Sequence, residues 1–461
     1  MQLLAARLLA PGAGGLSDAV FAGDWAAVGG RQCLGFLARA LASVFTGDAA
    51  ALALPAQALQ DVCWEQLHSG HWSSVDVAWR DAYALSTLLV AAATADGPIG
   101  GEAAAAAHEA RLEAALRQMD LAAMMGGPRF REHVDAAAAA AEAALAAERE
   151  RRAAADAPAA APLLLSQLPA PPVALPPGAL ADPLRILPVV EPPSLEAFML
   201  EYMLAPGGGR PVVIRGAIES WPALTRWQDA AYLERVAGRR TVPVEVGEHY
   251  LRDDWGTELM TLGDFLRRHV IGPAGAGGRG PDQQQSAAGG QQQQQQQRAA
   301  GEQPAGAAAG QRGQQRRGYL AQHELFSQIP ALAADIAAPD YTALGEDGLR
   351  SVNAWLGPAG TVTPLHQDPY HNLLAQVVGR KYVRVVSPAH TAALYPHAGG
   401  MHTNTSRVDA GAPDAARFPD YAAAPFWECV LQAGDMLYIP PKWWHYVTAV
   451  TASFSCSFWW S

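Results

Sequence analysis

Short apolar runs separated by Gly and Pro recur from about residue 185 to the end of the chain at residue 461. They include PVVIRG, VNAWLG, NLLAQVVG, KYVRVVSP, DMLYIP and SFSCSFWW. Runs of this length at such frequent spacing are typical of β-strands in a barrel or a sandwich. The sequence therefore predicts a β-rich domain over residues 193–461.

The first third of the chain has a different pattern. Apolar residues recur at helical spacing in LGFLARALASVF and YALSTLLVAAA, and residues 136–155 are Ala-rich with strong helix propensity. Residues 156–192 are Pro-rich and aperiodic, which is typical of a linker. We therefore expect an α+β chain, with an α-helical region over 1–155, a linker over 156–192 and the β-rich domain after it.

Residues 272–317 interrupt the β-rich domain with a Gln- and Gly-rich segment that contains PDQQQSAAGGQQQQQQQ. The segment has almost no large apolar side chains, so burial cannot offset the entropy that ordering it would cost. The sequence predicts a disordered insertion here, and loop padding without a function of its own is the simplest interpretation.

Charge and cysteine usage exclude several classes of protein. The formal net charge of −11 and the pI near 5.6 argue against broad binding to nucleic acids or anionic membranes. No stretch of about 20 apolar residues predicts a membrane span. The four cysteines form no short-spaced pair, which favours buried thiols in a reducing compartment. We expect an intracellular protein of the nucleus or the cytoplasm, with no direct nucleic-acid or membrane partner.

Two segments far apart in the sequence contain candidate metal ligands. His366 and Asp368 lie two positions apart in GTVTPLHQDPYHN, so on a strand both side chains project to the same face. His445 follows a strand and a Pro-Pro break in GDMLYIPPKWWHYV. Two His and one carboxylate leave coordination positions open, as in Fe(II) oxygenases, whereas a structural zinc site usually has four protein ligands. A chance HxD tripeptide with structural histidines is the alternative.

A lysine in the strand KYVRVV indicates what could bind beside the metal. A lysine that points into a barrel is costly unless it is paired, and the distal carboxylate of 2-oxoglutarate would pair with Lys381. A strand lysine that faces solvent is the alternative. Thr363 and Tyr250 are candidate hydroxyl donors to the same carboxylate.

Long motifs in the chain resemble the JmjC branch of the cupin-fold oxygenases. They are TVPVEVG with Tyr250 and Trp255, GYLAQHELFSQIP, residues 352–388, ALYPH, FPDYAAAPFWECVLQAGDMLYIPPKWWHYV and SFSCSFWWS. The resemblance covers about residue 190 to the C-terminus, except for the insertion. In addition, WEQLHSGHWSSVDVAWRDAY resembles the helical N-terminal region of an arginyl-hydroxylase-type member.

The resemblance implies a double-stranded β-helix of the jelly-roll type that uses Fe(II), 2-oxoglutarate and dioxygen. In that family's pattern His366, Asp368 and His445 would bind Fe(II), and Lys381 would pair with the distal carboxylate of 2-oxoglutarate. The cosubstrate would also contact Tyr250, Thr363 and Asn372, and Trp355 would line the substrate side. The insertion is the main departure from the pattern.

Several functions are compatible with these features. The resemblance implies first a hydroxylase that acts on an arginine side chain of a protein or peptide substrate. A histone lysine demethylase would use the same chemistry, because hydroxylation of an N-methyl group releases formaldehyde. A non-catalytic cupin-fold binding module and a metal-dependent isomerase are further alternatives, although the isomerase would not need Lys381. We expect a monomer, because SFSCSFWWS reads as a last strand with no helices after it.

Overall fold

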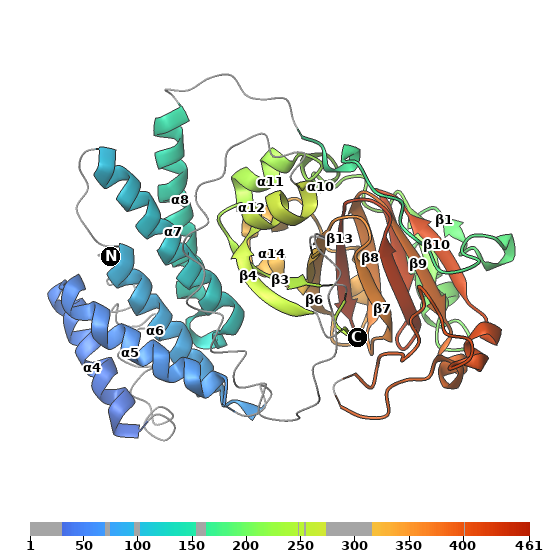
Figure 1. Ribbon diagram of the computed structural model, residues 1–461, viewed down its shortest axis with the longest axis horizontal. Helices are drawn as coiled ribbons and strands as arrows, with labels where there is room; N and C mark the ends of the chain where they lie inside the picture. The colour runs from blue at the N-terminus through green and yellow to red at the C-terminus, as the bar shows by residue number, and fades with distance from the viewer. Residues whose placement is uncertain are drawn as a thin grey trace, which may run out of the picture.

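The computed structural model describes residues 30–69, 74–95, 102–153, 163–247, 249–252, 255–272, 316–400 and 402–461. The insertion predicted to be disordered lies outside the described residues except at its two ends. A helical region lies at one end of the elongated molecule and a β domain at the other (Figure 1).

In the part of the helical region that the structure describes, five long helices each pack on the next along the chain. They are α4(Gly30–Thr46), α5(Ala49–Leu67), α6(Val77–Ala95), α7(Glu102–Met125) and α8(Arg131–Ala153). Asp48 caps α5 by accepting a hydrogen bond from the backbone N–H of Ala51 at 2.9 Å. Helix α6 is buried along most of its length, so it forms the centre of a core that includes Leu59, Leu88 and Leu116.

Two mainly antiparallel sheets form the β domain. The larger has the order β1-β2-β11-β8-β13-β6-β5-β3-β4, and the smaller has the order β10-β9-β12-β7. The strands are β1(Val189–Val190), β2(Val212–Arg215), β3(Thr241–Val246), β4(Gly256–Thr261), β5(Gly318–His323), β6(Leu349–Gly357), β7(Val362–Gln367), β8(His371–Val378), β9(Lys381–Val386), β10(Trp427–Leu431), β11(Asp435–Ile439), β12(Trp444–Ala449) and β13(Ser453–Trp460).

The two sheets face each other across an apolar core. Leu374 and Leu437 from the larger sheet pack in one buried cluster with Val383, Val385 and Leu431 from the smaller sheet. Their side chains alternate with residues on the other face of each strand, as the period of a strand requires. The prediction of an α+β chain with a jelly-roll type of domain is confirmed.

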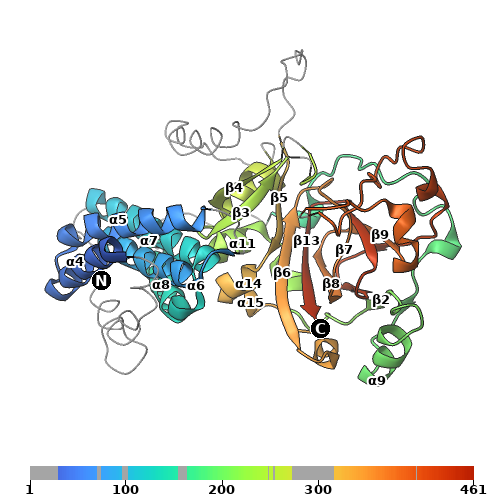
Figure 2. The same ribbon diagram turned by 90° about the horizontal axis from the view of Figure 1, so that it is seen from below.

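Short helices pack around the larger sheet. They are α9(Leu195–Phe198), α10(Ala223–Arg226), α11(Ala230–Ala237), α12(Leu262–Phe265), α14(Leu325–Gln328) and α15(Pro330–Ala333). Of these, α11, α14 and α15 lie between the sheet and the helical region, whereas α9 lies on the other side of the β domain (Figure 2). The ring of Trp227 stacks on Phe454 of β13 and on Phe326 of α14, at centroid distances of 4.3 and 5.7 Å. Burial of such a side chain contributes roughly 2–3 kcal/mol, so the layer is firmly attached to the sheet.

Short segments of 3-10 or π-helix complete the described elements. They are η2(Pro128–Phe130), η3(Leu165–Gln167), η4(Pro183–Arg185), η5(Met199–Met203), η6(Leu266–Ile271), η7(Asp340–Leu344), η8(Pro388–Leu394) and η9(Pro419–Ala423). Among the described helices, none has the length and hydropathy needed to cross a membrane.

The segment with linker composition lies along the β domain from residue 163 onward. The backbone N–H of Leu165 donates to the carbonyl of Gln228 at 2.7 Å, and that of Leu180 donates to the buried carboxylate of Glu428 at 2.6 Å. Farther on, Leu187 bonds to the backbone carbonyl of Glu428. These contacts satisfy backbone groups that a free linker would leave to water.

Candidate active site

The three candidate metal ligands come together on two neighbouring strands. His366 on β7 and His445 on β12 are direct cross-strand partners, with ring centroids 4.1 Å apart. Asp368 follows the end of β7, and its Oδ2 lies 3.7 Å from Nε2 of His366 and 3.6 Å from Nε2 of His445. One donor atom from each residue lies within 4.8 Å of the other two. The structure thus joins residues separated by almost eighty positions in the sequence.

Backbone carbonyls hold both imidazoles in the orientation that suits a metal ligand. Nδ1 of His366 donates to the carbonyl of Pro364 at 2.8 Å, and Nδ1 of His445 donates to that of Trp443 at 3.0 Å. Because a carbonyl can only accept, both Nδ1 atoms are protonated and both Nε2 lone pairs remain available. Burial, assisted by the neighbouring His366, lowers the pKa of His445 to about 4. The ring is therefore neutral at pH 7.

The donor set fits a divalent cation. Oδ2 of Asp368 is buried and accepts no hydrogen bond. Such an orphaned carboxylate oxygen is costly, and a cation among the three side chains would satisfy it. Two imidazoles and one carboxylate without a thiol match the ligand set of non-haem Fe(II) oxygenases. The role of the three residues as iron ligands stays a prediction.

A pocket extends from these three residues into the space between the sheets. Its other lining residues are Tyr319, Trp355, Thr363, Asn372, Leu374, Lys381, Ile439, Val447, Ser457 and Trp459. Besides the candidate metal ligands, the lining contains one cationic side chain, that of Lys381. The rest of the wall combines apolar groups with a few hydroxyl and amide groups.

Lys381 is the cation in this pocket, and it is only 2% exposed. Its Nζ donates a hydrogen bond to the hydroxyl of Tyr319 at 3.3 Å. Burial lowers the pKa of Lys381 to about 7, since no ion pair with a described carboxylate offsets the loss of hydration. A buried lysine without a carboxylate partner fits an anionic ligand in the pocket. The alternative of a lysine that faces solvent is excluded by its burial.

Hydrogen-bonding groups beside Lys381 complete this end of the pocket. Burial raises the pKa of the Tyr319 hydroxyl, and the neighbouring hydroxyl of Thr363 acts in the opposite direction. Tyr319 accepts a hydrogen bond from Lys381, so its own O–H proton can be donated to a ligand. Oδ1 of Asn372 is buried without a hydrogen-bond partner. The residues present fit a dicarboxylate such as 2-oxoglutarate.

Tyr319 is the residue that sequence reasoning missed. The sequence suggested Tyr250 as a hydroxyl donor, but the cavity lining does not include Tyr250. The Tyr250 hydroxyl lies 3.4 Å from Oγ1 of Thr405, and its ring stacks on His402. Tyr319 lies in the GYLAQH motif, whose pairing with β3 and β6 brings it into the pocket. The GYLAQH motif was the signal that could have pointed to Tyr319. The sequence of the motif does not show which strands it pairs with.

Trp355 lies in the lining of the pocket, close to Lys381, and its place on the substrate side, which the resemblance implied, stays a prediction. Its Nε1 donates to Oγ of Ser457 on β13 at 2.9 Å, and its ring centroid lies 6.0 Å from Nζ of Lys381. The cross-strand pairing of Trp355 with Ser455 places the ring over this part of β13. Trp355 and Ser457 therefore shape the part of the pocket that surrounds Lys381.

A partly buried carboxylate lies beside this pocket. Glu245 on β3 is the cross-strand partner of Tyr319 and accepts a hydrogen bond from Nε1 of Trp255 at 3.2 Å. Burial raises the pKa of Glu245. Its charge raises the pKa of both Tyr319 and Tyr250, in addition to the larger effect of burial on each. Glu245 is thus linked to the pocket through its pairing with Tyr319.

Comparisons with known proteins agree with this architecture. The model of a cupin-like domain family matches residues 198–461, and a model described as KDM8-like N-terminal ARM repeats matches residues 35–156. The latter match assigns the helical region to a type of helical repeat.

Three relatives illustrate the similarity. Lysine-specific demethylase JMJ30 of Arabidopsis thaliana is 39% identical over 88% of this chain and 85% of its own length. Lysine-specific demethylase 8 of Danio rerio is 34% identical over 88% of this chain and 87% of its own length. Jumonji C domain-containing protein 5 of Drosophila melanogaster is 42% identical over 59% of each chain.

The family models cover both parts of the chain, and the relatives extend across their boundary. The resemblance that the sequence motifs indicated is confirmed. Together with the His-Asp-His cluster and the adjoining pocket, these matches show that the chain belongs to the JmjC family of cupin-like 2-oxoglutarate-dependent dioxygenases and has KDM8-like helical repeats before its catalytic domain.

Proposed function

We propose that His366, Asp368 and His445 bind Fe(II) and that 2-oxoglutarate occupies the adjoining pocket. The observation that carries this proposal is the buried Nζ of Lys381, which has no described carboxylate partner and points to an anionic ligand. Lys381 would pair with the distal carboxylate, and Tyr319 would donate to the same group. When bound, iron and 2-oxoglutarate activate dioxygen and release succinate and carbon dioxide.

The chain's own residues bind and orient these groups and exclude water. The carbonyls of Pro364 and Trp443 accept from Nδ1 of the two imidazoles and orient both rings so that each Nε2 can face a metal ion. Asn372 offers a buried amide oxygen without a partner, which would accept a hydrogen bond from a water bound to the cosubstrate. Apolar side chains such as Leu374 and Val447 line the rest of the pocket and limit competing hydrolysis.

We propose a basic side chain of a protein as the substrate. Glu245, the cross-strand partner of the pocket residue Tyr319, contacts the indole of Trp255, and a carboxylate beside an aromatic ring attracts a cation. The names of the Arabidopsis and zebrafish relatives favour demethylation of N-methyl-lysine over the arginine hydroxylation that the sequence motifs suggested first. Lysine demethylation is therefore the leading proposal.

Arginine hydroxylation is the second candidate, and the same carboxylate supports it. Only one oxygen of Glu245 accepts the indole N–H of Trp255, so the other remains for a substrate. A guanidinium has several N–H donors that match a carboxylate, whereas a trimethylammonium group has none. Glu245 therefore fits an arginine at least as well as a methylated lysine.

One experiment separates these outcomes. Peptides of the same sequence that differ only in one central residue (arginine, lysine or N-methylated lysine) are incubated with the full chain, Fe(II) and 2-oxoglutarate. Loss of a methylene with formaldehyde release supports demethylation, and gain of one oxygen on the arginine peptide supports hydroxylation. An Asp368→Ala variant is the control for chemistry without the iron site. Wild-type protein that forms no succinate under any condition would refute the proposed function.

Two finer expectations remain proposals. We propose a location in the nucleus or the cytoplasm, because all four cysteines are free and buried, as in a reducing compartment. We also propose that the chain acts as a monomer on a protein or peptide without direct contact to nucleic acid. A sedimentation mass of twice the chain mass would contradict the monomer.

A further inference from the structure

A buried ion pair joins the helical region to the β domain. Asp120 of α7 is fully buried, and Arg240, the residue before β3, is 2% exposed. Oδ1 of Asp120 accepts from Nε and Nη2 of Arg240 at 2.8 and 2.7 Å. Its Oδ2 accepts the backbone N–H of Thr241 at 2.6 Å. Because Thr241 begins β3, a side chain of the helical region holds the first residue of a catalytic-domain strand.

The guanidinium of Arg240 is satisfied by groups from both regions. Nη1 donates to Oε1 of Glu142 on α8 at 3.0 Å, and Nη2 donates to the backbone carbonyl of Gln328 on α14 at 2.8 Å. The attraction to Asp120 and Glu142 raises the pKa of Arg240 despite its burial. The stability of a buried charge such as that of Arg240 depends on all of its partners. If one partner is lost, a charged or polar group remains buried without a hydrogen bond.

Gln328 extends the network to a second strand. Its Nε2 donates to Oδ1 of Asp120 and to the carbonyl of Thr241, both at 2.8 Å. Its Oε1 accepts from Nε2 of His323 at 2.6 Å. Burial lowers the pKa of His323, so the ring is neutral and Nε2 carries the proton that it donates. His323 is the last residue of β5, and the network therefore fixes one end of both β3 and β5.

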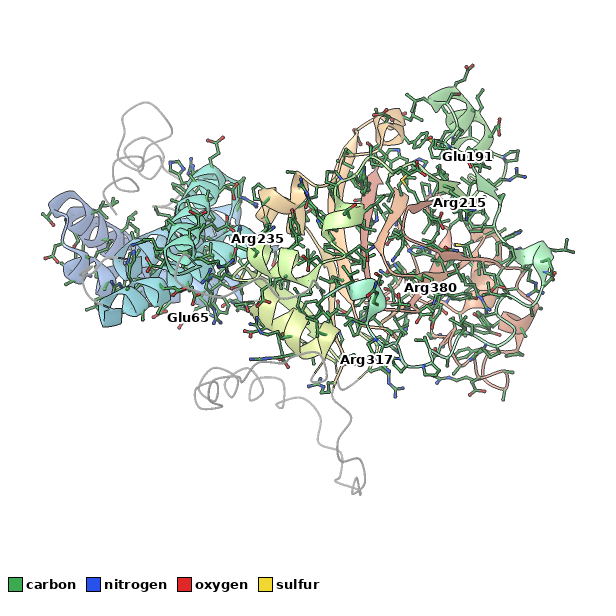
Figure 3. All side chains as sticks on the ribbon, turned by 90° about the horizontal axis from the view of Figure 1, so that it is seen from above. Glu65, Glu191, Arg215, Arg235, Arg317 and Arg380 are labelled. Carbon is green, nitrogen blue, oxygen red and sulfur yellow. The ribbon has the colours of Figure 1, made fainter. Side chains whose placement is uncertain are left out.

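The other polar contacts between the two regions are more exposed. Arg239 pairs with Glu109 and Glu113 of α7, and the side chain of Glu113 is 47% exposed. Arg149 of α8 donates to the carbonyl of Arg235, which lies where the helical region meets the short helices of the catalytic domain (Figure 3). Water and salt weaken such pairs, so the buried network determines the position of β3 and β5 more strictly.

Both strands lead from this network to the pocket. Along β3, Thr241 contacts Asp120 and Glu245 is the cross-strand partner of Tyr319. Along β5, His323 belongs to the network, and Tyr319 contacts Lys381 in the pocket. Strand β3 pairs with β4 without a break from Thr241 to Val246, whereas β5 has a register shift between Leu320 and His323. A shift at the network would therefore reach the Tyr319 hydroxyl mainly through β3 and its pairing with β5.

We propose that Asp120 is a positioning residue for the cosubstrate pocket: from the helical region it holds β3 and β5, and thereby sets the place of the Tyr319 hydroxyl. The inference rests on the proposed function in so far as that pocket binds 2-oxoglutarate. The helical repeats are then a part of the catalytic unit that controls cosubstrate affinity, in addition to any contact they make with other proteins.

The test is a double-mutant cycle on the full chain. Binding of 2-oxoglutarate to Mn(II)-loaded protein without substrate is measured by calorimetry, and the KM for 2-oxoglutarate and kcat are measured separately. Asp120→Asn keeps the shape of the side chain but replaces an acceptor by a donor that faces the N–H of Thr241. We expect about fivefold weaker binding and a KM that rises with little change in kcat, the effect of weakening one hydrogen bond in the pocket.

The cycle pairs Asp120→Asn with Tyr319→Phe. If Asp120 acts through the Tyr319 hydroxyl, the double variant binds no more weakly than Tyr319→Phe alone. Gln328→Leu is the milder variant, because it breaks the links from Asp120 to His323 and keeps the ion pair. Glu113→Gln, which weakens only an exposed pair of the same interface, is the matched control and should bind like the wild type.

The outcomes are distinct. Weaker binding by Asp120→Asn and Gln328→Leu, with a non-additive cycle, supports the inference. Unchanged affinity in both folded variants, or effects that add to that of Tyr319→Phe, would overturn it and leave the network with a role in stability alone. Wild-type protein that binds no 2-oxoglutarate would instead contradict the proposed function.

Discussion

Nζ of Lys381 donates a hydrogen bond to the hydroxyl of Tyr319 over 3.3 Å in the lining of the pocket, and both side chains are buried. Tyr319 comes from the larger sheet and Lys381 from the smaller one, so the contact exists only because the two sheets pack face to face. The same pair places a cation and a free O–H donor where a carboxylate could reach both.

Replacement of Lys381 should abolish turnover of 2-oxoglutarate. Lys381→Ala removes the only cation in the lining of the pocket, and a buried carboxylate without a cation loses several kcal/mol of stabilisation, or about a thousandfold in affinity. Succinate formation measures the effect. Arg380→Ala, which alters the exposed neighbouring residue, is the matched control and should retain activity. Normal succinate formation by Lys381→Ala would show that another group binds the cosubstrate.

Affinity for 2-oxoglutarate should fall as the pH rises above 7. Burial lowers the pKa of Lys381 to about 7 in the free pocket, and pairing with a carboxylate raises it again. Between these two pKa values the complex holds one proton more than the free protein, so binding takes up a proton. The Kd should then rise about tenfold per pH unit above 7. Calorimetry in buffers of different ionisation enthalpy measures both quantities, and a Kd that is constant from pH 7 to 9 would exclude this linkage.

Metal binding should stabilise the fold through Asp368. The buried Oδ2 of Asp368 has no hydrogen-bond partner, which costs free energy in the folded protein. A divalent cation that coordinates this oxygen removes that cost. At a hundredfold excess of metal over its Kd, the free energy of unfolding should rise by about 2.7 kcal/mol. Thermal unfolding with and without Mn(II) measures the shift. Asp368→Ala should abolish it, and Asp61→Ala on the surface of α5 should not; a full shift in Asp368→Ala would place the metal elsewhere.

The metal-free chain should lose stability as the pH falls below 6.5. The pKa of His445 is about 4 in the folded protein and near 6.5 in the unfolded chain, so the unfolded chain binds more protons between these values. Stability is complete above pH 6.5 and is lost as the pH approaches 4, by up to about 3 kcal/mol for this residue. Urea unfolding from pH 7 to 4.5 measures the slope. His445→Asn should flatten it, and an equal slope in that variant would assign the effect to other groups.

Much of the architecture follows from local patterns. The strands of the catalytic domain contain β-branched and aromatic runs bounded by Gly and Pro, and the helices contain Ala-rich runs with apolar residues at helical spacing. Residues His366 and Asp368 lie on one side of the chain because the side-chain period of a strand is two. These features depend on neighbours within a few residues, so the amino-acid sequence by itself determines them.

The tertiary structure decided which distant residues meet. It placed His445 opposite His366, Tyr319 instead of Tyr250 beside Lys381, and Asp120 against Arg240. Strand pairing and domain packing select these contacts from many that local patterns allow, because each depends on the free energy of burying whole surfaces together. Nearby sequence determines which residues can serve as ligands and which segments form strands. The pocket and the polar network around Asp120 arise only from long-range packing.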